Sequence, residues 1–550
     1  MNRRARTLRR LLYVMGVAAC ALCPAMADDS VRAQPLPSFA ELQAARAVIG
    51  EIRIEPENIF DLDDPKENNI LFRAANLLHI RTRPSVIKRS LLFHSGEPVS
   101  VRLIEETERL LLGNAPIYDV RIEPFAYYDG IVDIKVRTRD TWTLQPGLSY
   151  SRSGGVNSGG VSVSEQNFAG TGIAIGVRYT STIDRSGSEF HIADTHAFGG
   201  WTTISYDYAD YTDGFSEAFR FERPFYALDT RWAAGASGST LDRVDSLYTG
   251  GNVIGQYHHH QDSGEVYGGW SRGLIEGWTQ RYSAGASYQA DTYRFDPTLS
   301  PPAQPPADQT LAGPFVRYEV VEDKYQRLQN RDRIQRPEYF NMGFQGQAKV
   351  ERALPAFGST QSSWLFSASA TEGLRLFDRH DLLTSASYSG QYGTVYGDVQ
   401  ALGGSARYYA PHSPVALFYV AVSGDLVKSP NPADQLLLGG DNGLRGYPLR
   451  YQAGAHRALF TAEERVYTDW YPFRLFRVGG AVFYDVGRAW GGPIENPNPG
   501  WLSDVGFGLR ILSDRAAFGN IVHVDLAFPL RNTDPNIKSS QFLVTTHKTF

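Results

Sequence analysis

Charged side chains in residues 430–550 alternate with apolar ones, and this alternation assigns them to faces. In Val478–Gly487 and Phe460–Asp469 apolar residues recur at every second position, as in a strand with one apolar face. Phe483, Asp485 and Glu463 therefore share the opposite, inward face. The inward positions of these and the following segments also include Arg465, Asp504, Arg510, His523 and Asp525. A wall lined with carboxylates can hold a guanidinium through bidentate, charge-assisted hydrogen bonds that a lysine cannot reproduce.

A candidate guanidinium lies in Leu436–Gln452, a glycine-rich segment typical of a loop. The loop contains the motif Leu444-Arg445-Gly446-Tyr447. Gly446 allows close backbone approach, and Tyr447 offers a packing face. Ordinary pairing of inward charges explains part of this pattern. The pattern as a whole predicts a latch between the loop and the wall rather than a catalytic site.

Two common enzyme motifs are absent. The chain has no His-Glu-x-x-His and no nucleotide-binding loop, and its scattered carboxylates form no defined catalytic pair. His258-His259-His260 could bind a metal, but three adjacent histidines in a polar stretch are more typical of a solvated loop. We therefore expect no enzyme, no cofactor and no metal site.

The first 27 residues resemble a secretory signal peptide. Five arginines precede an apolar stretch, and Ala25-Met26-Ala27 offers a cleavage site. A membrane anchor is the alternative, but the stretch is short, and a lipoprotein box around Cys20 fits less well. Cleavage would remove both cysteines. It would also remove five arginines from a chain whose formal net charge is −5, so the remaining chain would have a net charge of about −10. An exported acidic chain argues against a nucleic-acid partner.

The alternating pattern of residues 142–550 predicts a transmembrane antiparallel β-barrel. The chain of 550 residues has 12% aromatic residues and 53 Gly, and this part consists of runs with apolar residues at alternate positions. An apolar strand face needs a second sheet or lipid, and in lipid only a closed barrel pairs every backbone group. We expect about 16 strands, although residues 240–415 do not divide cleanly. The connections Phe295–Thr310 and Glu322–Pro337 are expected outside the cell. Glu464 falls on the lipid side and is expected near a rim or at a bulge. A soluble sandwich or carbohydrate-binding module is the alternative.

Residues 50–140 predict a small αβ domain after a linker at 28–49. A strand at Ile52 is followed by helices over Pro84–Leu92 and Val101–Leu112, and then by two strands, Tyr118–Phe125 and Ile131–Arg137. Asp129-Gly130 is typical of the hairpin turn between these strands. The stretch Asp61–Thr82 has no assigned role.

Two parts of the chain resemble a known family. The segment RSLLFHSGEPVSVRLIEETERLLLGNAPIYDVRIEPF (89–125) resembles a POTRA module, the periplasmic domain of outer-membrane assembly proteins, although a generic αβ sandwich is the alternative. The Arg445 motif, Thr461-Ala462-Glu463 and Phe483-x-Asp485-x-Gly487 resemble the barrel of the BamA/TamA family, as do residues 147–179 with their Asn167-Phe168 turn. The resemblance implies a loop over 430–455 that folds into the lumen, where its arginine docks on carboxylates of two strands.

The resemblance implies a function in protein transport. The latch would comprise Leu444, Arg445, Gly446 and Tyr447, with lumenal partners Glu463, Phe483, Asp485 and Gly487. Phe542, Val544 and the terminal Phe550 resemble the signal by which assembly machinery recognises an outer-membrane barrel. We expect an outer-membrane insertase or translocase of a Gram-negative-type cell, with its POTRA in the periplasm and with lipids and unfolded client polypeptides as partners. The alternatives are a passive pore and a dedicated secretion pore for one exoprotein.

Overall fold

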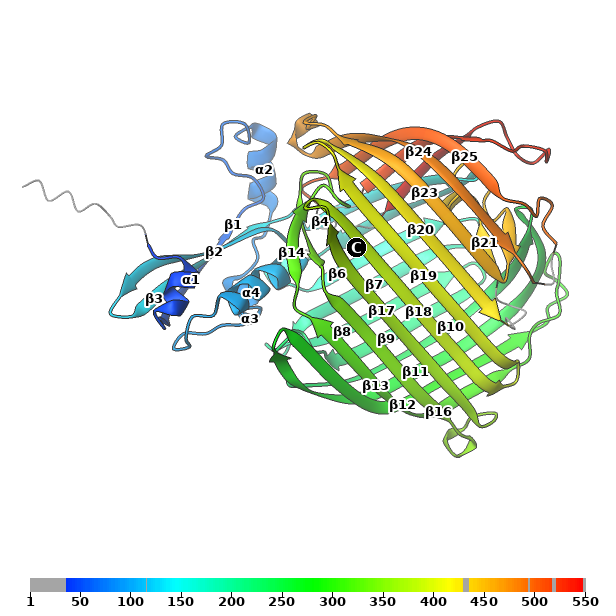
Figure 1. The fold of residues 1–550 in the computed structure, drawn as a ribbon, viewed down its shortest axis with the longest axis horizontal. Coiled ribbons are helices and arrows are strands. Elements are labelled where there is room, and N and C mark those ends of the chain that lie inside the picture. Colours follow the sequence, from blue (N-terminus) through cyan, green and yellow to red (C-terminus); the bar gives the residue numbers. More distant parts are fainter. Residues whose placement is uncertain (1–35, 115, 429–434, 493–494, 517–520, 548–550) are drawn as a thin grey trace, which may run out of the picture.

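A computed structural model describes residues 36–547 except 115, 429–434, 493–494 and 517–520. The expected signal peptide and Phe550 lie outside the described residues. The chain forms an N-terminal unit beside a large barrel (Figure 1). None of the helices in the described part has the length and hydropathy of a membrane-crossing segment.

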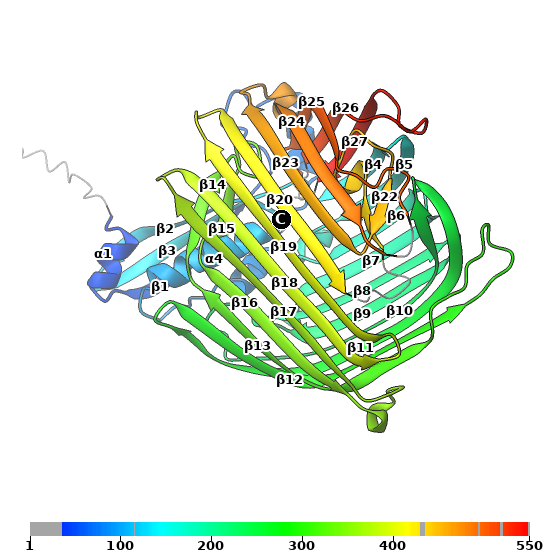
Figure 2. The same cartoon turned by 45° about the vertical axis from the view of Figure 1, so that its right-hand side comes forward.

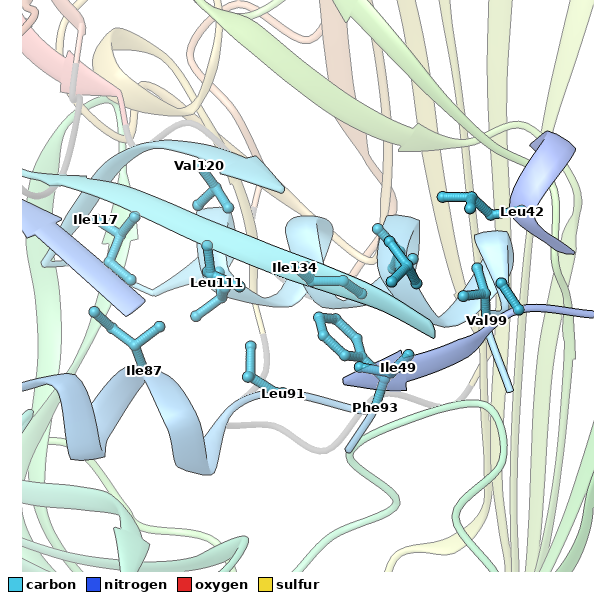
Figure 3. Packing of buried hydrophobic residues seen from close by; sticks show 14 residues of the cluster. Leu42, Ile49, Ile87, Leu91, Phe93, Val99, Leu111, Ile117, Val120 and Ile134 are labelled. Atoms are coloured by element: carbon cyan, nitrogen blue, oxygen red, sulfur yellow. The ribbon is translucent and has the colours of Figure 1, made fainter. Parts of the chain in front are cut away.

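The N-terminal unit is a three-stranded sheet with helices. The central strand β3 pairs in parallel with β1 and antiparallel with β2. Apolar side chains from the sheet and helices form one core, in which Ile87, Leu111 and Ile134 are fully buried (Figure 3). The elements are α1 (Phe39–Ala44), β1 (Val48–Glu57), α2 (Ile70–Leu78), α3 (Pro84–Arg89), α4 (Val101–Gly113), β2 (Ile117–Tyr128) and β3 (Ile131–Asp140).

Residues 39–49 belong to this unit, so the linker expected at 28–49 is too long. Ser38 and Glu41 form a capping box that starts α1, and Leu42 and Ile49 lie in the core. A helix of six residues is too short to produce a clear periodic pattern, which is why the sequence did not predict it. The second difference is α2, which forms within the unassigned Asp61–Thr82 stretch.

The remaining chain forms a closed antiparallel barrel of 20 strands, so the expectation of about 16 is wrong. Strands in the middle of the chain reach 24 residues, and turns such as Gly250-Gly251 leave no visible break between them. The barrel strands are β4 (Leu144–Ser153), β5 (Val156–Glu165), β6 (Ala174–Ser181), β7 (Ser186–Ala197), β8 (Thr202–Tyr211), β9 (Gly214–Arg223), β10 (Trp232–Thr249), β11 (Asn252–Ile275), β12 (Trp278–Arg294), β13 (Gln309–Glu322), β16 (Phe344–Ala353), β17 (Ser363–Leu376), β18 (His380–Thr394), β19 (Gly397–Pro411), β20 (Ala416–Lys428), β23 (His456–Tyr467), β24 (Phe476–Trp490), β25 (Leu502–Ser513), β26 (Ile521–Pro529) and β27 (Gln541–His547).

The two ends of the barrel differ. The end beside the N-terminal unit is called the near end, and β4 begins there (Figure 1). Because neighbouring strands are antiparallel, residues 295–308 lie at the far end and residues 323–343 at the near end. The expectation that Phe295–Thr310 and Glu322–Pro337 lie on the same, outer side is therefore wrong, because the second connection lies at the end beside the N-terminal unit.

Side chains on the outer surface of the barrel are apolar. Exposed residues at alternate positions include Leu148, Val161, Val163, Val177, Val266, Val316, Val482, Phe507 and Leu509. Glu464 lies three residues from the near end of β23 and bonds to His412 at 2.7 Å, which places it near a rim. The three histidines are not in a loop, because they lie within β11, where His259 is buried and bonds to Asp245 and Asp291 at 2.8 and 3.1 Å.

Candidate functional site in the barrel lumen

The described part of the expected inward loop, residues 435–455, folds inside the barrel and is called the latch loop (Figure 2). Its two ends pair as β21 (Leu436–Leu438) and β22 (Gln452–Gly454). Leu444, Tyr447 and Tyr451 pack in a buried cluster with Ala489 and Leu502 of the barrel wall. This apolar cluster holds the loop against β24 and β25.

Arg445 contacts three carboxylates of the wall. Its Nε and Nη2 donate to the two oxygens of Asp485 at 2.7 and 3.0 Å, which is a bidentate geometry. Its Nη1 donates to Glu463 at 2.8 Å and to Asp525 at 3.4 Å. The guanidinium also stacks 3.3 Å from the centroid of the Phe483 ring. The structure thus brings Arg445 together with Glu463, Phe483 and Asp485.

Burial and charge act in opposite directions on this arginine. Desolvation lowers the pKa of Arg445, but the carboxylates of Asp485 and Glu463 raise it well above its ordinary value. The guanidinium therefore stays charged. Asp504 lies directly opposite Asp485 on the next strand and is fully buried, so the wall is acidic beyond the direct contacts.

Two glycines allow the loop to approach the wall. A Cβ on Gly446 would lie 2.7 Å from the Cβ of Asp504 and 2.9 Å from the backbone N of Pro529. A Cβ on Gly487 would lie 2.9 Å from the carbonyl oxygen of Ala458 and 3.1 Å from Leu438 of the loop. Tyr447 donates from Oη to the carbonyl oxygens of Ser503 and Arg531 at 3.0 and 3.1 Å.

Gly446→Ala is expected to destabilise the folded barrel by about 1–3 kcal/mol, because the added methyl group overpacks a backbone contact. The temperature at which the folded band is lost in heat-modifiability gels measures this effect. Gly424→Ala is the matched control, since its nearest atom would lie 3.7 Å away. Equal transitions for both variants would show that the close approach contributes no stability.

The latch loop also reaches the opposite wall. Arg450 forms a bidentate pair with Asp184 in the turn between β6 and β7. Burial raises the pKa of Asp184, but hydrogen bonds from Arg450 and Tyr248 more than offset this and lower it. Gly250 and Gly251, between β10 and β11, donate to the carbonyl oxygens of Tyr451 and Arg450 at 3.1 and 3.2 Å. The loop therefore spans the lumen.

Several of these contacts had no sequence signal. Arg450 and Asp184 are 266 residues apart, and each is an ordinary charged residue near a glycine or a turn. Gly154 packs so closely on Leu449 that a Cβ would lie 1.9 Å from its backbone N, yet the sequence there indicates only a turn. Asp525 was placed on the inward face by alternation, but nothing in the sequence paired it with Arg445.

A second segment enters the barrel at the near end. Residues 325–341, called the mouth hairpin, contain β14 (Tyr325–Gln329) and β15 (Pro337–Asn341) (Figure 2). Arg331 at its tip pairs with buried Asp381 at 2.7 Å, and Asp332 accepts from Tyr409 at 2.8 Å. Ile334 is fully buried among apolar side chains of the wall, including Tyr409, Leu417, Tyr467, Leu512 and Ile521. The hairpin is thus anchored across the near mouth.

The mouth hairpin joins the N-terminal unit to the latch. Glu108 of α4 accepts from Tyr339 at 3.0 Å, and Arg109 stacks 3.7 Å from the centroid of the Tyr325 ring. On the lumenal side, Arg465 donates to Glu463 at 2.8 Å and to the carbonyl oxygen of Arg331 at 3.2 Å. Glu463 therefore accepts from Arg445 and from Arg465, which in turn bonds to the mouth hairpin.

The barrel closes at a short seam between its first and last strands. Among the described residues, β27 and β4 pair only through Val544 and Arg152. By contrast, β26 and β27 pair without a break, from Ala527 opposite Gln541 to Ile521 opposite His547. Phe542 is exposed on the outside of β27, and the role of Phe542, Val544 and Phe550 in assembly stays a prediction.

No protein-family model and no curated protein matches this sequence. The solved structures that resemble the fold include the following three. BamA from Haemophilus ducreyi lacking POTRA domains 1–3 is 12% identical, covering 91% of this chain and 85% of that one, with a TM-score of 0.41. CdiB from Escherichia coli is 11% identical, covering 91% and 76%, with a TM-score of 0.48. The FrpB iron transporter from Neisseria meningitidis is 10% identical, covering 91% and 92%, with a TM-score of 0.41. These likenesses assign no family.

A cavity of about 1490 Å³ lies beside the mouth hairpin at the near end. The first barrel strands form one wall, with small and polar residues such as Gln145, Ser162 and Ser164. The N-terminal unit contributes Tyr118, and the hairpin contributes Arg336. The hairpin therefore leaves space open on the side of the first barrel strands, next to the seam.

Proposed function

We propose that this protein is an outer-membrane insertase or translocase for polypeptides. A closed barrel pairs its backbone groups internally, and the apolar exterior is suited to lipid rather than water. The N-terminal unit, which carries the resemblance to a POTRA module, would then lie in the periplasm. The terminal aromatic residues would act as the recognition signal for assembly machinery.

The seam is the observation that carries this proposal. A barrel whose first and last strands share one described residue pair has two edges that separate at little cost. Unpaired strand edges are templates for pairing with another strand. A client strand could add to either edge before it is released into the bilayer.

The near end offers a path to that seam. In the N-terminal unit β2 is an edge strand among the described residues, and such an edge can bind an extended chain through backbone hydrogen bonds with little demand on sequence. The near-end cavity adjoins the first barrel strands. By contrast, a passive pore has no need of a lumen crossed by two anchored segments.

A disulfide across the seam tests the proposal. Arg152 and Val544 are directly paired, so cysteines there lie within reach of a disulfide or a short bis-thiol linker. We expect the oxidised variant to insert normally but to lose client assembly, with recovery on reduction. Val161→Cys with Tyr179→Cys locks an ordinary strand pair and serves as the control.

Proteomics of the outer membrane and medium distinguishes the alternatives in cells that depend on the locked protein. Loss of many barrels supports an insertase, and loss of one exported protein supports a dedicated secretion pore. Normal levels of every protein, with solute uptake alone changed, would contradict the proposal and favour a passive pore.

A further inference from the structure

Helix α2 presents an apolar face that no part of the described chain covers. At about 100° per residue, Ile70, Leu71, Ala74, Leu77 and Leu78 fall within an arc of about 120°. Ile70, Leu71, Leu77 and Leu78 are 87, 62, 85 and 75% exposed. Isolated exposed leucines are common, but a contiguous aliphatic face on a nine-residue helix indicates a binding surface.

The opposite face of α2 fixes this orientation. Phe72 is 3% exposed and stacks on Phe60 with ring centroids 3.9 Å apart. Asn76 accepts from the backbone N of Phe60 at 3.1 Å and donates to its carbonyl oxygen at 2.8 Å. Because these contacts are specific, the helix cannot rotate its aliphatic face inward without breaking them.

The segment around α2 is fastened to barrel turns on both sides of the seam. Trp142 and Leu475 pack on the Phe60–Phe72 pair, and Leu475 belongs to the turn after β23. Arg515, after β25, donates to the carbonyl oxygen of Ile59 at 3.2 Å and pairs with Glu67. On the other side, the backbone N of Arg83 donates to the carbonyl oxygen of Gly170, after β5, at 2.9 Å.

The surroundings of α2 match a bilayer interface. Near-end turns and strand ends carry exposed aromatic residues, as membrane barrels do at the lipid–water boundary; these are Phe168, Phe198, Phe377, Trp470 and Phe473. Exposed basic residues flank the aliphatic face, namely Lys66, Arg73, Arg81 and Arg83. Cations beside an apolar helical face suit anionic lipid headgroups. Figure 1 shows α2 beside the near end of the barrel.

We propose that α2 is an interfacial helix whose aliphatic face enters the near-side lipid leaflet next to the seam. This inference rests on the proposed membrane location of the barrel. The occupant of the face is lipid, because α2 is fastened beside near-end turns that carry exposed aromatic residues and its aliphatic face is flanked by exposed basic side chains. The helix would hold the N-terminal unit at a fixed height and tilt relative to the bilayer.

Site-specific fluorescence tests the proposal in the full protein. Cys20 and Cys23 lie in the expected signal peptide and residues 24–550 contain no cysteine, so Leu77→Cys provides a single labelling site once residues 1–27 are removed. The protein would be placed in nanodiscs of phosphatidylethanolamine and phosphatidylglycerol, with quenchers at defined acyl depths. We expect a label at residue 77 to be quenched most by shallow lipid quenchers and to be protected from aqueous iodide. Glu105→Cys, exposed on α4, should show the reverse.

Two outcomes would overturn the inference. A label at residue 77 that iodide quenches freely is in water, and one shielded from both iodide and lipid quenchers is covered by protein, such as a bound client. Val161→Cys, on the outer face of β5, tests the underlying location separately. If the label at residue 161 is quenched by lipid and that at residue 77 is not, the barrel spans the bilayer and only the role of α2 is wrong. If neither is quenched, the proposed location itself fails.

Discussion

Replacing Arg445 with alanine is expected to destabilise the barrel by about 3–5 kcal/mol, because the buried carboxylate of Asp485 loses its charged partner. Glu463, Asp485 and Asp525 would lose their shared guanidinium in a wall that already holds Asp504. The latch loop would then detach from β24 and β25. Heat-modifiability and protease digestion of the loop measure the two effects.

Matched variants separate the latch from a general loss of charge. Arg445→Lys should recover only part of the stability, since an ammonium group cannot reproduce the bidentate geometry. Arg178→Ala removes an exposed arginine 3.8 Å from Glu189 and should cost at most about 1 kcal/mol. Adding Asp485→Asn to Arg445→Ala should restore stability, because it removes one unpaired charge. Additive losses in that double variant would contradict the latch.

Removing the mouth hairpin is expected to raise the single-channel conductance of the barrel several-fold. The backbone N of Met342 donates to the carbonyl oxygen of Lys324 at 2.8 Å, so an Asn-Gly turn can join these residues in place of 325–341. The near mouth would lose the segment that is anchored at Asp381 and Tyr409. Planar-bilayer recordings give the conductance directly.

A deletion at the other end controls for the loss of chain length. Shortening the far-end connection within residues 298–306 should leave the conductance unchanged, because this segment does not cross the near mouth. An unchanged conductance after removal of the mouth hairpin would mean that the N-terminal unit or the latch loop closes the lumen instead. The same hairpin variant is expected to retain its folded band at room temperature, since β13 and β16 still pair.

Local pattern was sufficient to predict which residues face the lumen. The two-residue period placed Glu463, Phe483 and Asp485 opposite Val482 and Tyr484, and the structure buries the first three and exposes the last two. The pattern was not sufficient to count the strands. A strand such as β11 continues well beyond the ~10 residues that cross a bilayer, and two-residue turns leave no polar gap to mark its end.

Contacts between distant segments could not be predicted from the sequence. The mouth hairpin has the composition of an exposed loop. Its residues Arg331 and Ile334 are buried only by packing against distant segments of the chain. Helix α2 was missed for the opposite reason, because its aliphatic residues face outward and belong to no core of the protein. A sequence pattern identifies a buried face well only where other residues of the same protein cover that face.

The two oxygens of Glu463 link the latch loop to the mouth hairpin. One accepts from Arg445 of the latch loop, and the other from Arg465, which bonds to the tip of the mouth hairpin. An event at the N-terminal unit that frees the hairpin would therefore alter the surroundings of the far latch. Thermodynamic linkage is reciprocal, so opening the latch would loosen the hairpin by the same free energy. A contact made at one end of the barrel would in this way change the stability of the segment at the other end.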